Sequence, residues 1–403
     1  MKGKTIVLGV TGSIAAYKAA DLASKYVQAG AAVNVIMTKS AVEFITLLAF
    51  RTITARPVVT GMFDIASEYS VEHVALAEAA DIVVIAPATA NIIARIAGGI
   101  ADDMLSCTVL ATKAPVLIAP AMNVNMWENE VTQHNVKRLA DRGVTIVGPG
   151  YGRLASGIQG EGRLVDLEEI FAATCKILGE KGDLAGKRIV ITAGGTQEPI
   201  DPVRCVTNRS SGKMGYALAE AARDRGAKVT LISAPTALPK PYGVEFVDCM
   251  TAQQMFEAVQ KATAKTDVLI MAAAVADYKP VKTAEHKIKR KADTMTLDLE
   301  RTVDILAGVK GKFLRVGFAA ESNDLIANAK DKLQRKALDL IVGNDVTAKG
   351  CGFGSDSNKV VMIDRTGGME KPPLLPKREV ADKILNKVVS LLKADPYLTG
   401  FKR

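Results

Sequence analysis

The sequence predicts an α/β protein made of two doubly wound domains. Three observations support this prediction. Short apolar runs end in glycine-rich turns and lead into amphipathic stretches, which is the order of a strand, a turn and a helix. This order opens the chain and starts again near residue 187. The length of 403 residues suits two or three domains of ~150 residues each.

The first pattern begins at the N-terminus. Residues 4–8 (KTIVL) predict a strand, GVTGS a turn and residues 14–28 a helix that Gly30 ends before the strand AAVNVIMT. DIVVIAPATAN and APVLIAPAMN predict further buried strands, and residues 166–180 predict a closing helix with an acidic first turn. Ligands of such a domain bind beyond the carboxyl ends of its strands.

The second pattern follows a short polar linker, KGDLAG. Residues 187–192 (KRIVIT) predict a strand, AGGT a turn, and residues 213–225 a helix that begins only after an insertion. AKVTLIS, DVLIMAAAVADY, LRVGFAAES and LDLIVGNDV predict further strands, with a helix at 323–337. We therefore predict domains at 1–182 and 183–403.

Composition excludes several classes of protein. Hydrophobic residues make up 48% and charged residues 24%, which is ordinary for a globular protein. The five cysteines form no CxxC pair and the three histidines have no ligand spacing, so a zinc ribbon, a disulfide scaffold and a His-rich metal site are disfavoured, and we expect a cytoplasmic location. The apolar N-terminus is broken by glycine and serine, and Ile82–Ile100 contains proline and arginine, so we expect neither a signal peptide nor a membrane span.

The net charge of +9 is unevenly distributed. Residues 1–181 hold 16 basic and 17 acidic side chains, which leaves 36 and 26 in the remainder. The basic second part indicates anionic partners, although a basic surface that only aids solubility fits equally well. With aromatic residues at 5%, nucleic-acid binding through base stacking is disfavoured.

Neither glycine turn matches a nucleotide fingerprint. GVTGS lacks the GxGxxG pattern, and Gly212–Lys213 lacks the earlier glycine of a P-loop. Gly12 and Ser13 nevertheless stand at the start of a predicted helix, where backbone amides bind phosphate. A plain tight turn is the alternative.

Longer motifs carry a resemblance. GVTGSIAAYK, EHVALAEAADIVVIAPATAN, PAMNVNMW and GYGRLASGIQGEGR resemble the flavin-containing cysteine decarboxylases. GGTQEPIDPVRCVTNRSSGKMG, AAAVADY, EHKIK and VGFAAES resemble the phosphopantothenate–cysteine ligases. In this order they resemble the bifunctional enzyme family of coenzyme A synthesis. The resemblance implies a flavodoxin-like flavoprotein domain followed by a ligase domain, both Rossmann-like.

For the first domain, the resemblance implies binding of FMN, which makes the thiol-bearing carbon of the substrate an electron sink for decarboxylation. It assigns His73 as the base and Asn123 as a substrate contact, where a surface histidine and a turn former are the structural alternatives. The FMN contacts that it implies lie at helix starts and strand ends, where helix capping is the alternative role: Gly12, Ser13, Ser40, Thr89, Ser106 and Met122.

One position departs from the family. The family's mobile loop reads Ala-Cys-Gly and its cysteine donates a proton, whereas this chain reads Ala155-Ser156-Gly157. A hydroxyl is a far weaker acid than a thiol, whose pKa is ~8.5. Either Ser156 relays a proton through water, or another group donates it, or the reaction stops at an enethiol. We expect complete decarboxylation and a glycine-rich lid at this loop.

For the second domain, the resemblance implies activation of a carboxylate by CTP, with Mg²⁺ and cations around the phosphates. It assigns Asn208 to the processing of the acyl-nucleotide, places Arg204 and Ser211 in the same loop, and makes Asp277 a tentative Mg²⁺ ligand. The CTP-binding positions that it implies are Ala273, Asp277, Lys287, Val303, Asp304, Phe318, Lys332 and Lys336. Val303 departs from the family's proline, which makes the contact at Val303-Asp304 less certain.

The predicted function is therefore ligation of 4′-phosphopantothenate with L-cysteine, followed by decarboxylation to 4′-phosphopantetheine. The resemblance implies trimeric and dimeric contacts, hence a dodecamer, with no nucleic-acid or membrane partner. The alternatives are a protein with only its ligase active, a nicotinamide-dependent oxidoreductase and a basic nucleic-acid-binding protein.

Overall fold

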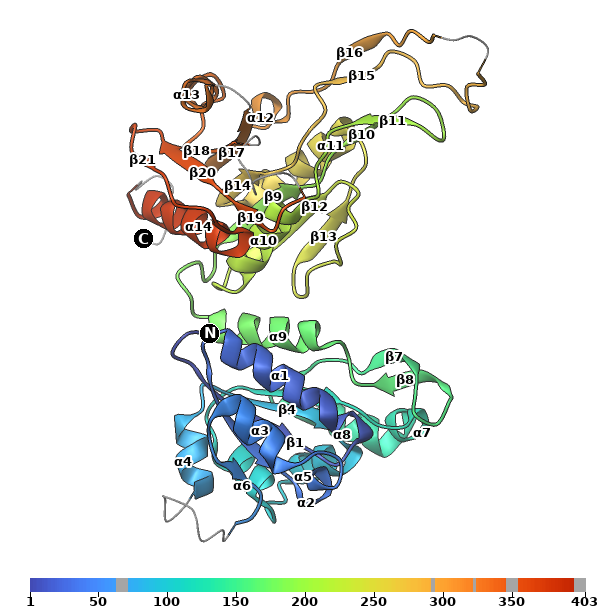
Figure 1. Cartoon of the computed structure of the whole chain (residues 1–403), viewed down its shortest axis with the longest axis vertical. Coiled ribbons are helices and arrows are strands. Elements are labelled where there is room, and N and C mark those ends of the chain that lie inside the picture. Colours follow the sequence, from blue (N-terminus) through green and yellow to red (C-terminus); the bar gives the residue numbers. More distant parts are fainter. Residues whose placement is uncertain (63–71, 291–293, 322–323, 346–353, 395–403) are drawn as a thin grey trace. The chain divides into compact units, whose positions relative to one another are not determined.

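The computed structural model describes residues 1–62, 72–290, 294–321, 324–345 and 354–394. The chain divides into two compact units, residues 1–178 and 179–403, four residues before the predicted boundary. Each unit is a parallel sheet with helices on both faces (Figure 1). The predicted α/β, doubly wound fold class is confirmed.

The sheet of the first unit has the order β3-β2-β1-β4-β5-β6, and all its pairs are parallel. Its strands are β1 (Thr5–Val10), β2 (Ala32–Met37), β3 (Val58–Val59), β4 (Ile82–Ala88), β5 (Val116–Pro120) and β6 (Thr145–Ile146). This is the strand order of dinucleotide-binding folds, whereas flavodoxin-like domains follow the order 2-1-3-4-5. The unit thus differs from the expected flavodoxin order because β3 pairs outside β2.

Helices cover both faces of this sheet. They are α1 (Tyr17–Gln28), α2 (Lys39–Val42), α3 (Leu47–Thr54), α4 (Glu72–Ala79), α5 (Ala90–Gly98), α6 (Met104–Ala111), α7 (Val124–Glu128), α8 (Glu130–Asp141) and α9 (Leu167–Gly179), with a 3₁₀ turn at Ile14–Ala16. The single helix predicted over 14–28 is therefore two elements. On one face, Val83, Ile85 and Ile118 of the strands pack with Ile92 and Leu105 of the helices. Each such buried side chain contributes ~1.5–3 kcal/mol.

The sheet of the second unit has the order β13-β12-β9-β14-β17-β18-β20-β21. The first six strands are parallel: β9 (Arg188–Ala193), β12 (Lys228–Ser233), β13 (Glu245–Asp248), β14 (Val268–Met271), β17 (Leu314–Glu321) and β18 (Leu340–Asp345). β20 (Val360–Asp364) and β21 (Met369–Glu370) add antiparallel to the edge. Strand β14 ends at Met271, so Asp277 lies in a loop and not at the end of the predicted strand MAAAVAD.

Alternate residues of the strands face two cores. Ile189 and Ile191 of β9 join α10 (Lys213–Arg223) and α14 (Lys377–Ala394), whereas Val190 faces the other side. That side is covered by α11 (Ala252–Ala262), α12 (Ile305–Gly308) and α13 (Leu325–Arg335). Because successive side chains of a strand point to opposite faces, the buried apolar strands supply a core on each face of the sheet.

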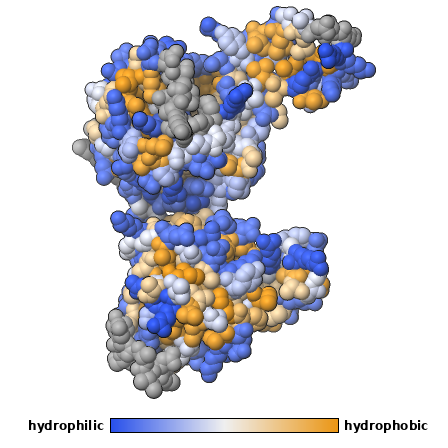
Figure 2. Space-filling view, in the orientation of Figure 1, coloured by the Kyte–Doolittle hydropathy of each residue, from blue (hydrophilic) through white to orange (hydrophobic). Residues whose placement is uncertain are grey.

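Two small ribbons extend from the second unit (Figure 1). The insertion between β9 and α10 contains β10 (Gln197–Pro199) and β11 (Cys205–Thr207), and β15 (Tyr278–Pro280) pairs with β16 (Leu299–Arg301). Figure 2 shows orange areas on this extension. The exposed large hydrophobic residues of the two ribbons and their loops include Val203, Tyr278, Val281, Met295 and Leu299.

A buried hydrogen bond joins α1 to α9 and yields a stability prediction. Tyr26 is fully buried, stacks on Phe171, and shares a 2.7 Å hydrogen bond with Thr174, which itself donates to the Ile170 carbonyl. Thr174→Val leaves the Tyr26 hydroxyl buried without a partner, so the first unit should lose about 1–3 kcal/mol of stability. The double variant Thr174→Val/Tyr26→Phe should recover most of that loss. The only tryptophan, Trp127, reports urea unfolding of this unit; a double variant as unstable as the sum of the two single variants would contradict the prediction.

Candidate active sites

The carboxyl ends of β1 and β2 form a narrow cradle in the first unit. A Cβ built on Gly12 would lie 2.3 Å from the Ser40 Cβ, so only glycine permits this approach. Ser13 begins the 3₁₀ turn and accepts a hydrogen bond from the Ala15 amide. Nearby in the chain, the buried Thr38 Oγ1 has no partner among the described residues. Gly12 and Ser40 therefore lie in close contact, with Ser13 next to Gly12, and binding of a phosphate by these residues stays a prediction.

Thr89 joins this edge of the sheet from β4. Its amide donates to Thr11 Oγ1 over 3.1 Å, and Thr11 donates to the Pro87 carbonyl. Its own hydroxyl caps α5. Ser106 is 2% exposed and belongs to the capping box of α6 with Asp103, so its hydroxyl already has a local role. Cofactor contact by Ser106 stays a prediction.

The PAMN segment lies against a β-hairpin. The Met122 amide donates to the Gly162 carbonyl over 2.9 Å, and a Cβ on Gly162 would lie 2.4 Å from the Met122 oxygen. The hairpin consists of β7 (Gly150–Arg153) and β8 (Gln159–Arg163). Asn123 caps α7, its Oδ1 accepting from the Asn125 amide. The structure thus joins Met122, Asn123 and the glycine-rich loop.

Ser156 is exposed in the turn of this hairpin, which is closed by a hydrogen bond from the Leu154 amide to the Ile158 carbonyl. The glycine-rich segment is therefore a hairpin with a register shift between Gly150 and Tyr151 and a short turn, and its action as a lid stays a prediction. His73 lies in the first turn of α4 and is half-buried, and no described residue forms a hydrogen bond with it. Its role as a base stays a prediction.

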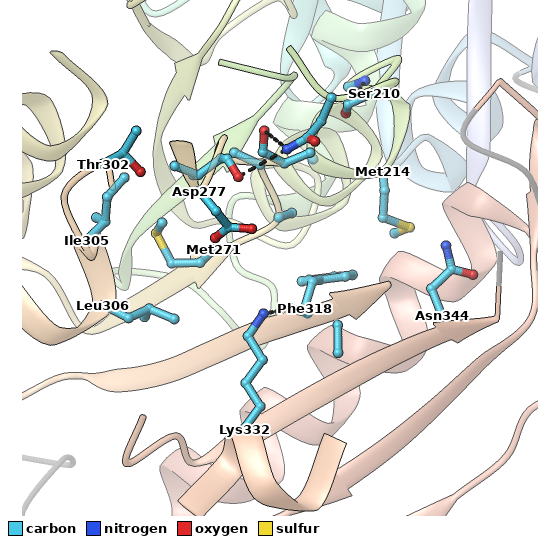
Figure 3. A pocket seen from close by; sticks show the side chains of 18 of the residues that line it. Ser210, Met214, Met271, Asp277, Thr302, Ile305, Leu306, Phe318, Lys332 and Asn344 are labelled. Atoms are coloured by element: carbon cyan, nitrogen blue, oxygen red, sulfur yellow. Dashed lines mark hydrogen bonds between the residues drawn. The ribbon is translucent and has the colours of Figure 1, made fainter. Parts of the chain in front are cut away.

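The second unit contains a cavity of about 830 Å³ beyond the carboxyl ends of β9, β14 and β17 (Figure 3). Nine of the predicted positions line it: Asn208, Ser211, Ala273, Asp277, Val303, Asp304, Phe318, Lys332 and Lys336. Eight of them were predicted to bind CTP or a metal ion or to process the substrate, and Ser211 was predicted only to lie in the same loop as Asn208. A volume of this size holds a nucleotide-sized ligand.

Asn208 fixes one wall of this cavity. Its Nδ2 donates to the carbonyls of Ala274 and Val275 over 3.2 and 3.1 Å. The same loop is held by the Ala276 amide, which donates to Thr196, and by the Thr302 amide, which donates to the Asp277 carbonyl. These bonds present the Asp277 carboxylate to the cavity (Figure 3).

Lys332 of α13 and Lys336, the residue that caps the C-terminus of this helix, have partners within the chain. Lys332 donates to the Phe318 carbonyl over 2.8 Å, and Lys336 contacts the Asp304 carboxylate. Burial raises the pKa of Asp304, but Lys336 and the Ala307 amide outweigh it and hold that pKa below its usual value. A phosphate at Lys336 would compete with this carboxylate.

Arg204 and Lys287 do not line the cavity. The Arg204 guanidinium binds the buried Asp201 carboxylate and donates to the Ile288 carbonyl over 2.9 Å. It therefore ties the β10–β11 ribbon to the segment that carries Lys287. Direct substrate contacts by these two residues stay predictions.

Sequence analysis missed a nucleotide fingerprint that is split along the chain. Gly194 turns the chain after β9 with φ +80°, and Gly212 begins α10 with φ +74°. Gly215 lies so close to β9 that a Cβ would be 2.6 Å from the Ala193 Cβ. In a GxGxxG motif, the first glycine permits a tight turn, the second lets a phosphate approach the backbone, and the third lets the helix pack closely on the strand. Gly194, Gly212 and Gly215 correspond to these three glycines in that order. The insertion 196–211 separates Gly194 from Gly212, so the motif is not continuous in the sequence. The pair Gly212-x-x-Gly215 was the part of it that the sequence displayed.

Comparison with known proteins supplies the family. A flavoprotein family matches residues 1–179, and the C-terminal domain family of DNA/pantothenate metabolism flavoproteins matches residues 184–392. The coenzyme A biosynthesis bifunctional protein CoaBC of Bacillus subtilis strain 168 is 45% identical over 98% of this chain and 98% of its own. The chain belongs to the CoaBC family. CoaBC of Escherichia coli strain K12 is 43% identical over 96% of each chain.

Solved structures are similar to parts of this chain. The crystal structure of the C-terminal domain of a CoaBC is 45% identical and covers 53% of this chain and 100% of its own, with a TM-score of 0.46. A mutant PPC decarboxylase complexed with pantothenoylaminoethenethiol is 32% identical and covers 43% of this chain and 97% of its own, with a TM-score of 0.40. The predicted family is confirmed, and the first unit is a flavoprotein domain.

The described residues contain no cluster of three His, Cys, Asp or Glu side chains that could hold a metal ion, so a Mg²⁺ contact of Asp277 stays a prediction. Among the same residues, no helix has the length and apolar character of a membrane span.

The contact of Gly215 with β9 yields a prediction. In a free helix, Gly→Ala stabilises by about 1 kcal/mol. In this protein, Gly215→Ala should instead destabilise the second unit by about 1–3 kcal/mol, because the new Cβ meets Ala193 and the Thr192 carbonyl. Urea unfolding followed by far-UV circular dichroism should shift, while Trp127 fluorescence of the first unit stays unchanged. Gly98→Ala in α5, where a Cβ meets nothing closer than 3.7 Å, is the matched control and should be neutral or slightly stabilising.

Proposed function

We propose that this chain catalyses two consecutive reactions of coenzyme A biosynthesis. The second unit joins 4′-phosphopantothenate to L-cysteine at the expense of CTP, and the first unit decarboxylates the product to 4′-phosphopantetheine. The observation that carries the proposal is 45% identity to a CoaBC along essentially the full length of both chains. The cavity of the second unit, lined by nine of the predicted residues, supports it.

In the ligation, a carboxylate must first become an acyl-nucleotide, because a carboxylate anion resists attack by an amine. The negative charge that gathers in that step needs fixed donors and cations. Lys332, Lys336 and the N-terminus of α10 supply them in this cavity. The Asn208 amide, held on the 274–275 carbonyls, is in place to orient the acyl-nucleotide for attack by cysteine.

Mg²⁺ enters this proposal as a companion of the nucleotide. It is commonly bound through one or two carboxylates together with substrate phosphates and water, rather than by a complete protein cage. Asp277, one of the two carboxylates that line the cavity together with Asp304, fits that mode, in which three protein ligands are not required.

In the decarboxylation, the cradle at Gly12, Ser13 and Ser40 fits the phosphate of FMN. FMN supplies the oxidation that makes the carbon bearing the thiol an electron sink. His73 would take the proton and Asn123 would hold the substrate. Ser156 would stand over the same edge, because its hairpin is fixed to the backbone of Met122.

We also propose a homo-oligomer in the cytoplasm, with a dodecamer as the expected form. The exposed apolar residues of the ribbons, Val203, Tyr278, Val281 and Leu299 among them, provide a surface for the dimeric contact. Nothing in the structure or the comparisons favours a nicotinamide oxidoreductase or a nucleic-acid-binding protein.

The proposed function is tested by product analysis. Purified protein incubated with 4′-phosphopantothenate, L-cysteine, CTP and Mg²⁺ should yield 4′-phosphopantetheine, CMP and pyrophosphate in mass spectrometry. Omission of CTP should abolish all three products. If phosphopantothenoylcysteine is the final product, the proposed ligase activity stands and the proposed decarboxylase activity is wrong. If no condensation product forms, both proposed activities are wrong.

Ser156 gives a second prediction. A cysteine thiol is a stronger acid than a serine hydroxyl, so Ser156→Cys should speed formation of 4′-phosphopantetheine at least severalfold in single turnovers. Ser156→Ala, which removes the hydroxyl, should slow it and release enethiol, two hydrogens lighter than the product. Equal rates for all three proteins would contradict a proton-transfer role at this position.

A further inference from the structure

Two lysines that the family resemblance did not single out converge at one end of the ligase cavity. Lys213 begins α10 and Lys377 begins α14, and both line the cavity together with Asn344 and Asn358. Figure 3 shows Met214 and Asn344 on the side of the cavity away from Thr302 and Leu306. The cavity therefore has cations at this end as well as at the end of Lys332 and Lys336.

The position of Lys377 is electrostatically costly. Lys377 is 8% exposed. It begins α14, where the helix dipole disfavours a cation, and the cation of Lys213 lies near it. Burial, followed by the charge of Lys213, lowers the pKa of Lys377. Lysine is almost never buried to this degree unless it is paired.

The partners of the two lysines come from one short segment. Lys377 donates to the Ser355 carbonyl, and Lys213 donates to the Gly354 carbonyl over 2.9 Å and to Asp356 over 2.7 Å. The Asp356 side chain is 91% exposed, so its ion pair with Lys213 is weak. The ammonium groups of Lys213 and Lys377 thus donate their hydrogen bonds to carbonyl and carboxylate oxygens of the chain itself.

The start of α10 brings uncapped backbone donors to the cavity, which Asn344 also lines with an acceptor oxygen. Gly212 offers no side chain to the first amides of α10, and the first turn of that helix carries no acidic residue. The Asn344 Oδ1 is buried and has no hydrogen-bond partner among the described residues. In this strand order, the start of the helix that follows the first strand is where a phosphate group binds.

We propose that Lys213, Lys377 and the N-terminus of α10 form a phosphoryl-binding subsite of the ligase, with Asn344 as its polar side wall. It rests on the proposed function of the second unit and assigns it residues that the family resemblance left without a role. The group bound is a phosphoryl group of a substrate, carried either by the nucleoside triphosphate or by the phosphorylated carboxylic acid. On binding, Lys213 exchanges Asp356 for a phosphoryl oxygen.

The test compares charge-removing variants of the full-length chain. Lys213→Gln and Lys377→Gln should each weaken binding of inorganic pyrophosphate about tenfold or more in titration calorimetry, as loss of one charged hydrogen bond predicts. Lys383→Gln is the matched control, because Lys383 lies on α14 and is exposed. Lys377→Arg, which keeps the charge, should retain most of the affinity. Unchanged urea unfolding establishes that each variant is folded.

Steady-state kinetics identify the source of the phosphoryl group. A rise in KM for CTP alone places the triphosphate in the subsite, and a rise in KM for 4′-phosphopantothenate alone places the acid's phosphate there. Pyrophosphate affinity and both KM values equal to those of the unmodified chain in folded variants would overturn the subsite. That result is distinguishable from failure of the proposed function, in which the unmodified chain itself forms no condensation product.

Discussion

The close approach of α10 to β9 is the constraint on which the ligase unit depends. Gly215 lies where any side chain would collide with Ala193 and the Thr192 carbonyl, so the helix starts directly at the end of the strand. The chain leaves after Gly194, forms the β10–β11 ribbon and returns at Gly212. Because it returns to the same point, residues of the insertion, Asn208 above all, become walls of a cavity that the sheet alone would not enclose.

Both units are proposed to bind phosphorylated ligands, and they offer different groups for this. In the first, the close approach of Gly12 to Ser40 leaves a cradle lined by hydroxyls and helix starts. In the second, lysines surround the cavity. This matches the charge of the chain, in which 36 basic and 26 acidic residues follow residue 181. Under the proposed function, fixed dipoles would serve a ligand that stays bound, whereas a triphosphate that is consumed in each turnover would bring several charges that must be neutralised each time.

The sequence could predict what short-range pattern determines. The spacing of apolar residues, and the glycines that end each element, predict the strands at 5–10 and 188–193 and the helix at 213–223. It could not place Asp277, because the apolar run MAAAVAD continues after β14 has lost its partners at Met271. It could not join Gly194 to Gly212 across seventeen intervening residues, nor bring Lys377 to Lys213 over more than 160 residues, because both depend on the assembled sheet. Helix capping was predictable as an alternative role for Ser13, Thr89 and Ser106, and each of these side chains takes part in a helix cap.

The two sets of cations follow from what a ligase of this kind must hold. Two phosphorylated molecules, a nucleotide and an acid, have to meet in one cavity before the acyl-nucleotide forms. Their like charges oppose that meeting, and water is excluded from the place where they react. Cations at a single end would bind one molecule and leave the other repelled. In the proposed function, Lys332, Lys336, Lys213 and Lys377, which all line the cavity, would compensate the charges of both anions while their reacting groups meet. The carbonyl and carboxylate partners of these lysines keep their charges compensated until substrates replace them.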